Sequence, residues 1–331
     1  MTVFLHGLGH AHPRNEITNR FLEDLDIGTS DAWIIERVGI RSRRTVLALD
    51  YIRTTRNRDL SAALEAAEMS NAALGAAAAE MAIARAGIAP DDVGMVIAGT
   101  SASDTHSPAE ACNVARLLDL EVPAFDVQSA CTSFYVQLYL LSLMDPERLP
   151  DFVLLVAPDT LTTTVDYNDR SSAVLWGDAA AAAVLSTRHA APRHILGNSL
   201  ESSPAGADKV VVPRSAHFRQ EGRTVQMFGI KRMTRCLAQL REQFACEDRV
   251  FHFVGHQANL RMLDAVRKHC GIPAECHHTN VEWYGNTGAA SSASVISMNW
   301  DKWKPRDDVA VAGVGAGLTW SSYLLRFEET P

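Results

Sequence analysis

The sequence has little of what would place it in several common protein classes. Only 7% of its 331 residues are aromatic, and no uninterrupted apolar run reaches the roughly 20 residues that a membrane-spanning helix needs. Lysine and arginine (31) are outnumbered by aspartate and glutamate (39), which gives a net charge of −8. A nucleic-acid binder needs a basic excess to neutralise phosphates. We therefore expect neither nucleic acid nor a membrane among the partners of this chain.

The cysteines lack the density and the CxxC spacing of a disulfide scaffold or a zinc site. This pattern is typical of a reducing compartment, and the N-terminal segment MTVFLHGLGHAHP lacks the basic region and apolar core of a signal peptide. We therefore expect a cytoplasmic protein. His6, His10 and His12 lie in one segment without ligand spacing to any acidic or cysteine cluster, so we expect no metal. The six cysteines are Cys112, Cys131, Cys236, Cys246, Cys270 and Cys276.

Short apolar runs alternate with alanine- and leucine-rich stretches of helical composition. The alternation predicts an α/β fold, and the runs are too uniformly apolar for strands with one solvated face. The expected strands are residues 93–99, 151–157, 250–255 and 308–314. The expected helices are residues 69–87, 107–118, 131–145, 225–246 and 258–270.

The order of these elements indicates an internal duplication. Strands 93–99 and 250–255 each follow a long helix and a short acidic loop, at an offset of about 156 residues. At the same offset, the helix that opens at Cys131 corresponds to the one that opens at Asn286. We expect two copies of one unit, with an N-terminal half at residues 1–187 and a C-terminal half at residues 188–331. Such a pair would bring Cys131 and Asn286 towards each other, near the carboxyl ends of parallel strands.

Three polar residues lie at turns that lead into helices. Cys131, in FDVQSACTSFYVQL, begins a predicted helix, whose N-terminus favours the reactive thiolate and lowers the thiol's pKa. Read one at a time, Cys131 fits a buried inert thiol, His256 fits a structural histidine, and Asn286 fits a helix N-cap. The glycines of GVGAGLTW, residues 313–320, suggest close approach to a ligand but lack the helix and acidic residue of a dinucleotide site.

Taken together, these segments resemble the β-ketoacyl-acyl-carrier-protein synthase III family over nearly the whole chain. The resemblance implies an α/β thiolase fold, with five layers αβαβα made of two duplicated halves, and normally a homodimer. It also implies an acyltransferase that acts on coenzyme A or carrier-protein thioesters and needs no cofactor. The segments that carry it are TSDAWIIERVGIRSR, PAFDVQSACTSF, DYNDRSSAVLWGDAAAAAVL, GHQANLR, YGNTGAAS and GAGLTW.

The resemblance assigns a role to each of the three polar residues. Cys131 would take the starter acyl group from a thioester. His256 and Asn286 would stabilise charge on the thioester carbonyl of a malonyl extender as it loses carbon dioxide. The backbone N–H groups of Cys131 and Ala316 would form the oxyanion hole. The expected reaction is a decarboxylating Claisen condensation that gives a β-ketoacyl product.

Other positions match the family's substrate-binding residues. Trp33 and Arg170 resemble the pair that sandwiches the adenine of coenzyme A, with Arg37 near its phosphates. Asn259 and Gly222 match positions that line the pantetheine channel. A set of basic residues would dock an acyl carrier protein, although a solvated helix face explains them equally well. These residues are Arg261, Lys231, Arg232 and Arg235.

The sequence departs from the family pattern at three places. Thr132 and Ser133 follow the cysteine where a small residue and a glycine are typical, and Met227 replaces a docking lysine. Ser107 stands where short-chain members have a phenylalanine that closes the acyl tunnel from the partner subunit. We therefore expect a starter longer or bulkier than acetyl, such as a medium or long acyl chain, a β-ketoacyl group or an aromatic acid. The alternative is a specialised-metabolite ketosynthase or acyltransferase that joins preformed acyl or β-ketoacyl chains.

Two alternatives from other classes fit less well. A papain-like hydrolase shares the order Cys, His, Asn but needs a Cys-Trp context and usually disulfides, which this sequence lacks. A silent partner subunit would have lost the cysteine, whereas Cys131 is retained. Among the remaining residues we expect His277 and His278 on the surface, and residues 291–297 (SSASVIS) in a closely packed helix.

Overall fold

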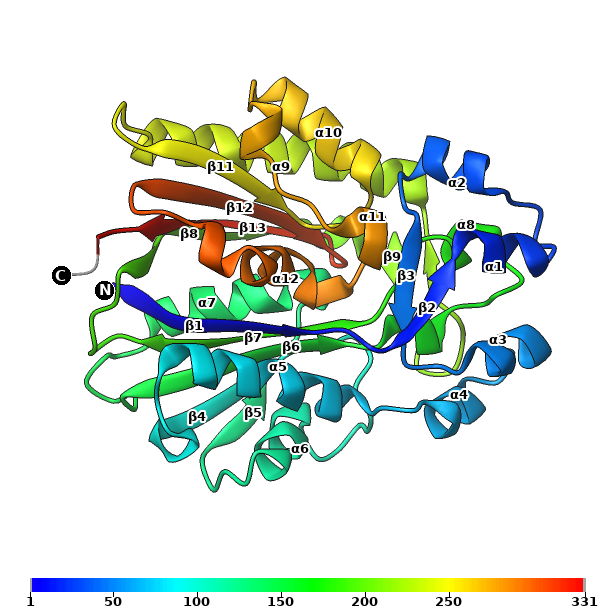
Figure 1. Ribbon diagram of the computed structural model, residues 1–331, viewed down its shortest axis with the longest axis horizontal. Helices are drawn as coiled ribbons and strands as arrows, with labels where there is room; N and C mark the ends of the chain where they lie inside the picture. The colour runs from blue at the N-terminus through cyan, green and yellow to red at the C-terminus, as the bar shows by residue number, and fades with distance from the viewer. Residues whose placement is uncertain (1, 330–331) are drawn as a thin grey trace.

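The computed structural model describes residues 2–329, and most of its strands form one nine-stranded sheet in the order β11-β12-β13-β8-β1-β7-β6-β4-β5 (Figure 1). The first five strands of this sheet along the chain are β1 (Val3–Ala11), β4 (Val93–Ala98), β5 (Ala124–Asp126), β6 (Phe152–Asp159) and β7 (Ala179–Ser186). The other four are β8 (Arg193–Ser202), β11 (Val250–Gly255), β12 (Asp307–Gly315) and β13 (Thr319–Phe327).

The sheet has two parts, β11-β12-β13-β8 and β1-β7-β6-β4-β5. Together with the helices, these two parts stack in five layers (Figure 1). Helix α5 packs on β1 and β7, whereas α9 packs on β12 and β13. Between the two parts of the sheet lie α7, which contacts β6 and β8, and α12, which contacts β1 and β11. None of the helices within residues 2–329 is long and apolar enough to cross a bilayer. The six main helices are α5 (Asn71–Ala86), α6 (Glu110–Leu117), α7 (Ser133–Leu143), α9 (Gly222–Phe244), α10 (Leu260–His269) and α12 (Ser291–Met298).

Strand pairing repeats between the two parts of the sheet. Strand β4 pairs with β6 in parallel and β6 with β7 antiparallel, just as β11 pairs with β12 and β12 with β13. Strand pairing joins the two parts at β1 and β8, where Val3 pairs with Ile195 and Phe4 with His194. A duplicated α/β arrangement is therefore visible in the topology, while the division at residues 187 and 188 stays a prediction.

Short elements gather at one end of the layers, on the right in Figure 1, where they flank the candidate site. They include the hairpins of β2 (Asn15–Thr18) with β3 (Ser42–Thr45) and of β9 (Val210–Val211) with β10 (Arg219–Gln220). The short helices are α1 (Asn19–Asp24), α2 (Asp31–Arg37), α3 (Leu49–Thr55), α4 (Leu60–Ala66), α8 (Arg170–Ala173) and α11 (Val281–Tyr284).

The four strands expected from apolar runs are confirmed as β4, β6, β11 and β12. Strand β7 was not expected from the sequence, because its alanines favour helix by intrinsic propensity. Every residue of β7 is buried between helical layers, where small side chains let the layers approach closely. The contact of β1 with α5 is equally close, because a Cβ on Gly7 would lie 2.0 Å from the Ala82 carbonyl oxygen. Tertiary packing therefore overrides propensity in these central strands.

Candidate active site

Cys131 lies in a single 3-10 turn, Ala130–Thr132, between β5 and α7. The residue before it, Ala130, has a φ of 48°, a left-handed conformation that non-glycine residues rarely adopt. The turn packs closely against the end of β12, since a Cβ on Gly315 would lie 3.0 Å from Thr132 Oγ1. Helix α7 itself begins at Ser133, so the cysteine precedes the helix instead of opening it.

The cysteine thiol is buried, and burial together with the charge of Asp159 raises the pKa of Cys131 to about 12. This differs from the expectation that a helix N-terminus lowers this pKa. Desolvation penalises the thiolate more than the short 3-10 turn and the following helix stabilise it. The resting thiol is therefore neutral, and its proton must leave during acyl transfer.

His256 directly follows β11, and its Nδ1 lies 2.7 Å from the hydroxyl of Ser291, the first residue of α12. Ser291 Oγ also accepts the N–H of Gln257 at 3.4 Å, which directs the serine proton towards His256 Nδ1. This arrangement favours the tautomer with the proton on Nε2, which can donate a hydrogen bond. Burial lowers the pKa of His256 to about 4, so the imidazole is neutral at pH 7.

Asn286 is fixed through both its backbone and its side chain. Its N–H donates to the carbonyl of Leu175 (2.8 Å), and its carbonyl accepts the N–H of Gly177 (3.0 Å). The side-chain Oδ1 accepts the N–H of Gly288 at 3.1 Å, which leaves the amide NH₂ to donate elsewhere. Helix α12 begins at Ser291, so the alternative that Asn286 is the N-cap of this helix is wrong.

Asp159, at the end of β6, braces the turn that follows Asn286. Its Oδ2 accepts the N–H of Ala289 at 2.7 Å, and a Cβ on Gly288 would lie 2.1 Å from the same oxygen. Its Oδ1 accepts the Ser101 N–H at 2.7 Å. Sequence reasoning missed Asp159, although a carboxylate at the end of the apolar run VLLVAPD was the available signal.

Cys131, His256 and Asn286 line one cavity of about 270 Å³. The structure thus brings Cys131 together with His256 and Asn286, which lie more than 100 positions further along the chain. Ala316 also lines the cavity, at the end of β12. Four further predicted residues line it as well, namely Trp33, Arg37, Gly222 and Asn259.

Trp33 and the two arginines expected around the adenine of coenzyme A lie together near this cavity. The guanidinium of Arg170 lies 4.9 Å from the centre of the Trp33 ring, and that of Arg37 lies 5.7 Å from it. Arg170 is also held by a hydrogen bond to the Gly28 carbonyl at 2.5 Å. A flat aromatic ligand would fit between the indole and Arg170 if their direct contact opened.

The basic residues expected to dock a carrier protein do not form one free cluster. Arg261 donates to the carbonyls of Ile35 (2.7 Å) and Glu36 (3.0 Å), and so joins α10 to the end of α2. Arg232 lies over the Trp320 ring at 3.9 Å. Lys231 and Arg235 are exposed on α9. Docking by this set stays a prediction; within residues 2–329, Lys231 and Arg235 make no ion pair, so their charged groups are the ones open to a partner.

Ser107 is exposed in the loop between β4 and α6 and does not line the cavity of its own chain. Met227 is 63% exposed on α9. Thr132, in contrast, is fully buried, and its hydroxyl bonds Thr319 Oγ1 at 2.7 Å. Of the three departures from the family pattern, only the one after the cysteine therefore changes packing inside this chain.

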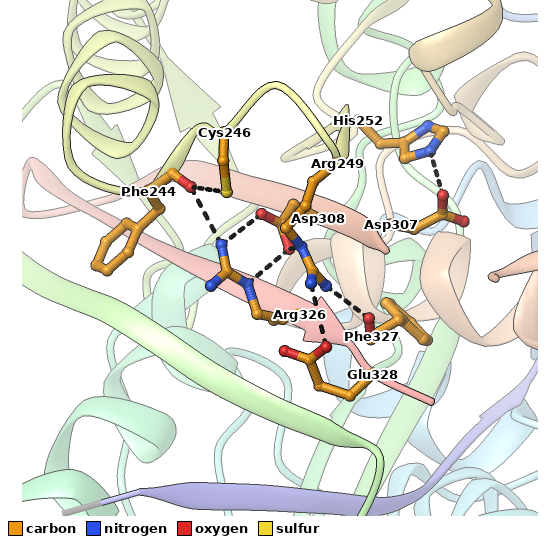
Figure 2. A network of polar contacts seen from close by, with 9 residues as sticks. All are labelled: Phe244, Cys246, Arg249, His252, Asp307, Asp308, Arg326, Phe327 and Glu328. Atoms are coloured by element: carbon orange, nitrogen blue, oxygen red, sulfur yellow. Dashed lines mark hydrogen bonds and ion pairs between the residues drawn. The ribbon is translucent and has the colours of Figure 1, made fainter. Parts of the chain in front are cut away.

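The expectation that His277 and His278 lie on the surface is wrong, because both are partly buried. The ring of His277 stacks on Phe253, and His278 Nε2 lies 3.0 Å from His252 Nδ1. His252 in turn lies 3.3 Å from Asp307, beside the polar network of Figure 2. Packing on aromatic rings buries these histidines, which a polar sequence context does not reveal. The expected close packing of SSASVIS is confirmed, since all seven residues are buried in α12.

Comparison with known proteins identifies the family. The profile of 3-oxoacyl-[acyl-carrier-protein] synthase III matches residues 125–204, and that of its C-terminal part matches residues 241–327. The β-ketoacyl-[acyl-carrier-protein] synthase III of Oceanobacillus iheyensis is 30% identical over 99% of both chains. That of Rhizobium meliloti is 33% identical over 97% of this chain and 98% of its own. The crystal structure of 3-oxoacyl-(acyl carrier protein) synthase III from Pseudomonas aeruginosa PAO1 superposes with a TM-score of 0.85 at 30% identity, covering 100% of each chain.

The fold is therefore the thiolase-like α/β fold of condensing enzymes. Within that class, the chain belongs to the 3-oxoacyl-[acyl-carrier-protein] synthase III family and is an acyltransferase of this type.

Proposed function

We propose that this chain condenses an acyl thioester starter, held on Cys131, with a malonyl-carrier-protein extender. The observation that carries the proposal is that a thiol, a neutral imidazole and a fixed amide, all on buried residues, line the same cavity. The carrier protein in the names of its relatives supports the choice of extender.

The first step is transfer of the starter. The sulfur of Cys131 attacks the thioester carbonyl, the bond to the departing thiol breaks, and the proton of Cys131 ends on that thiol. The N–H groups of Cys131 and Ala316 stabilise the tetrahedral oxyanion; in support, both residues line the cavity, Cys131 in its 3-10 turn and Ala316 directly after β12. Such a donor typically contributes about 3 kcal/mol to the transition state.

The second step is condensation. The malonyl carboxylate leaves as carbon dioxide, and the electron pair delocalises onto the thioester oxygen as an enolate. His256 Nε2–H and the amide NH₂ of Asn286, which both belong to buried residues, donate to this oxygen. The carbanion then attacks acyl-Cys131, the new carbon–carbon bond forms, and the thiolate leaves and takes a proton from solvent. The covalent intermediate predicts ping-pong kinetics.

Three variants test these roles separately. We expect Cys131→Ala to show no acyl adduct by intact mass after incubation with acyl-coenzyme A. His256→Ala and Asn286→Ala should load the acyl group but release labelled carbon dioxide from malonyl-carrier protein about 100- to 1,000-fold more slowly. Cys112→Ala, which removes an exposed cysteine, is the matched control and should retain full activity. An adduct on the Cys131→Ala protein, or normal decarboxylation by the Asn286→Ala protein, would refute the assignment.

We further propose that the starter is longer or bulkier than acetyl, because Ser107 replaces the phenylalanine that closes the tunnel in short-chain members. The test is the mass of the Cys131 adduct after incubation with acetyl-, octanoyl- and longer acyl-coenzyme A. Exclusive and fast acetyl loading would refute this part of the proposal. Joining of two preformed chains without release of carbon dioxide would support the alternative, a ketosynthase of specialised metabolism.

The proposal includes a homodimer, because the family's tunnel is closed by a partner subunit. Strand β5 is compatible with this, since it ends the sheet and pairs only with β4 among the described strands. An edge of this kind can pair with another chain. Light scattering coupled to size-exclusion chromatography would give the mass, and a monomer at micromolar concentration would count against a partner-closed tunnel.

A further inference from the structure

Arg43, in β3, is a fully buried cation whose hydrogen bonds go to neutral oxygens. Its Nε and Nη2 both donate to the carbonyl of Val174, at 3.1 and 2.6 Å. Its Nη1 donates to Oδ1 of Asn19 at 2.6 Å. Burial lowers the pKa of Arg43 to about 9, so the side chain is still protonated at neutral pH. A buried charge of this kind is unfavourable unless the surrounding structure holds it.

The carbonyl that Arg43 binds begins the segment that holds Asn286. Residues 175–177, directly after Val174, make the two backbone hydrogen bonds of Asn286 at 2.8 and 3.0 Å. The aliphatic part of Arg43 packs on the other side of the same junction, because a Cβ on Gly285 would lie 2.9 Å from its Cγ. Arg43 therefore contacts both chain segments that meet at Asn286.

The same arginine is linked to the adenine clamp. Asn19, which accepts from Arg43, donates to Asp31 Oδ1 at 2.7 Å. Asp31 is the first residue of α2, the helix that carries Trp33. On the other side, Val174 is the C-cap of α8, which begins at Arg170 over the Trp33 ring. Arg43 thus lies between the clamp for coenzyme A and the amide of Asn286.

We infer that Arg43 is a positioning residue, which sets the amide of Asn286 by clamping residues 174–177 and ties that amide to α2. The inference rests on the proposed function, because it gives Asn286 the role of donor to the extender's thioester oxygen. Loss of the guanidinium would leave the Val174 carbonyl without its donors and free the segment to shift. A displacement of about 1 Å at a catalytic donor can slow a reaction about 100-fold.

Separate measurements of acyl loading and of decarboxylation distinguish a positioning role of Arg43 from a general contribution to stability. Cys131 is held by a different element, the turn between β5 and α7, which Arg43 does not touch. At saturating acyl-coenzyme A, where weaker binding in the clamp does not limit the rate, we expect Arg43→Met to load octanoyl or acetyl groups on Cys131 within about twofold of the parent. Its release of carbon dioxide from malonyl-carrier protein should fall about 10- to 100-fold. Arg43→Lys keeps a charge and one donor to Val174, and should recover part of this loss.

A double-mutant cycle tests whether Arg43 acts through Asn286. If it does, Arg43→Met combined with Asn286→Ala should decarboxylate no more slowly than Asn286→Ala alone. Multiplication of the two effects, or an equal fall in loading and decarboxylation, would overturn the inference. Normal decarboxylation by the Asn286→Ala protein alone would instead refute the proposed function on which the inference rests.

Arg249 offers a control far from this junction (Figure 2). It directly precedes β11, whereas His256 directly follows that strand. Its side chain is 9% exposed and donates to the Phe327 carbonyl at 2.6 Å, so Arg249→Met also removes a buried guanidinium from a carbonyl. Unlike Arg43, Arg249 also pairs with Asp308 (2.9 Å) and Glu328 (3.1 Å). We expect it to lower the unfolding temperature but leave the ratio of decarboxylation to loading unchanged. A shift of that ratio equal to that of Arg43→Met would overturn the inference. If Arg43→Met does not fold, Asn19→Ala leaves the guanidinium and its bonds to Val174 in place, and removes the acceptor of Nη1 together with the donor to Asp31 and the Ile40 carbonyl. A smaller fall confined to decarboxylation is expected; the absence of such a fall would overturn the inference.

Discussion

His256 Nδ1 lies 2.7 Å from Ser291 Oγ, a contact that joins the turn after β11 to the start of α12. Both residues are buried, so the hydroxyl fixes the ring's orientation and tautomer without competition from water. Because the serine also accepts the Gln257 N–H, its own proton points to the imidazole and leaves Nε2–H as the donor to the cavity.

Removal of this hydroxyl should weaken catalysis without removing a catalytic group. We expect Ser291→Ala to lower kcat for condensation about fivefold, since one buried hydrogen bond contributes about 1 kcal/mol. Acyl loading should change less, because His256 acts in the decarboxylation step. Ser292→Ala is the control, because Ser292 lies next to Ser291 in α12 but its hydroxyl bonds Tyr135 of α7 and not His256. Steady-state rates at saturating substrate measure kcat for both variants. An equal loss of kcat in Ser291→Ala and Ser292→Ala would contradict the role of Ser291.

The pH dependence of acyl loading should follow the raised pKa of the buried Cys131 thiol. Since burial raises the pKa of Cys131 to about 12, the thiolate fraction grows roughly tenfold per pH unit up to that value. We expect the single-turnover rate of loading to rise continuously from pH 6 to pH 9.5. A plateau near pH 7 would show that the helix N-terminus, and not burial, controls this thiol. Circular dichroism at each pH would verify that the fold persists.

Some of this site was readable in the sequence because its chemistry lies in local motifs. Cys131, His256 and Asn286 each follow a strand or a glycine-rich turn, and their order along the chain is typical of the family. Arg43 and Asp159 were not assigned a role, because each acts through contacts with residues more than 100 positions away. No local pattern encodes a bond such as that from Ala289 N–H to Asp159, which exists only once the layers have stacked.

The fold shows the same division between local signals and tertiary packing. Apolar, β-branched runs located β4, β6, β11 and β12, because burial on both faces requires such residues. The alanines of β7 carry no such signal, and only the tight packing of helices on both faces explains why they form a strand. The expectation that His277 and His278 lie on the surface failed for the same reason, since tertiary packing places the ring of Phe253 over His277.

The stability of the protein should fall in acid through His12. Its ring stacks on Tyr284 with centroids 3.9 Å apart, and burial, aided by His10 and Arg44, lowers the pKa of His12 to about 3. The unfolded chain takes up a proton near pH 6.5, whereas the folded protein does not, so this contribution is complete above pH 6.5 and is lost as the pH falls.

Replacement by phenylalanine keeps the stack but removes the titration. We expect the free energies of unfolding of the parent and of His12→Phe to differ by a constant amount above pH 7. Near pH 5 the parent should lose about 1–2 kcal/mol relative to the variant. Urea titrations between pH 4.5 and pH 8 measure this difference. If the free energies of unfolding of the parent and of His12→Phe changed in parallel with pH, His12 would be solvated enough to titrate normally in the folded protein.

The choice of starter should be controlled by Ser107, if the partner subunit closes the acyl tunnel as the family resemblance implies. Because Ser107 is exposed in its own chain, Ser107→Phe should not disturb the core. A phenyl ring that enters the partner's tunnel would exclude long chains and leave room for acetyl. We expect the ratio of octanoyl to acetyl loading on Cys131 to fall about tenfold or more, as a pocket that is too short discriminates by size. Thr105→Phe adds the same ring at an exposed position of the same loop, and should leave the ratio unchanged. If both variants behave alike, the ring acts through the loop and not through the tunnel, and the length of the starter must be set elsewhere in the cavity.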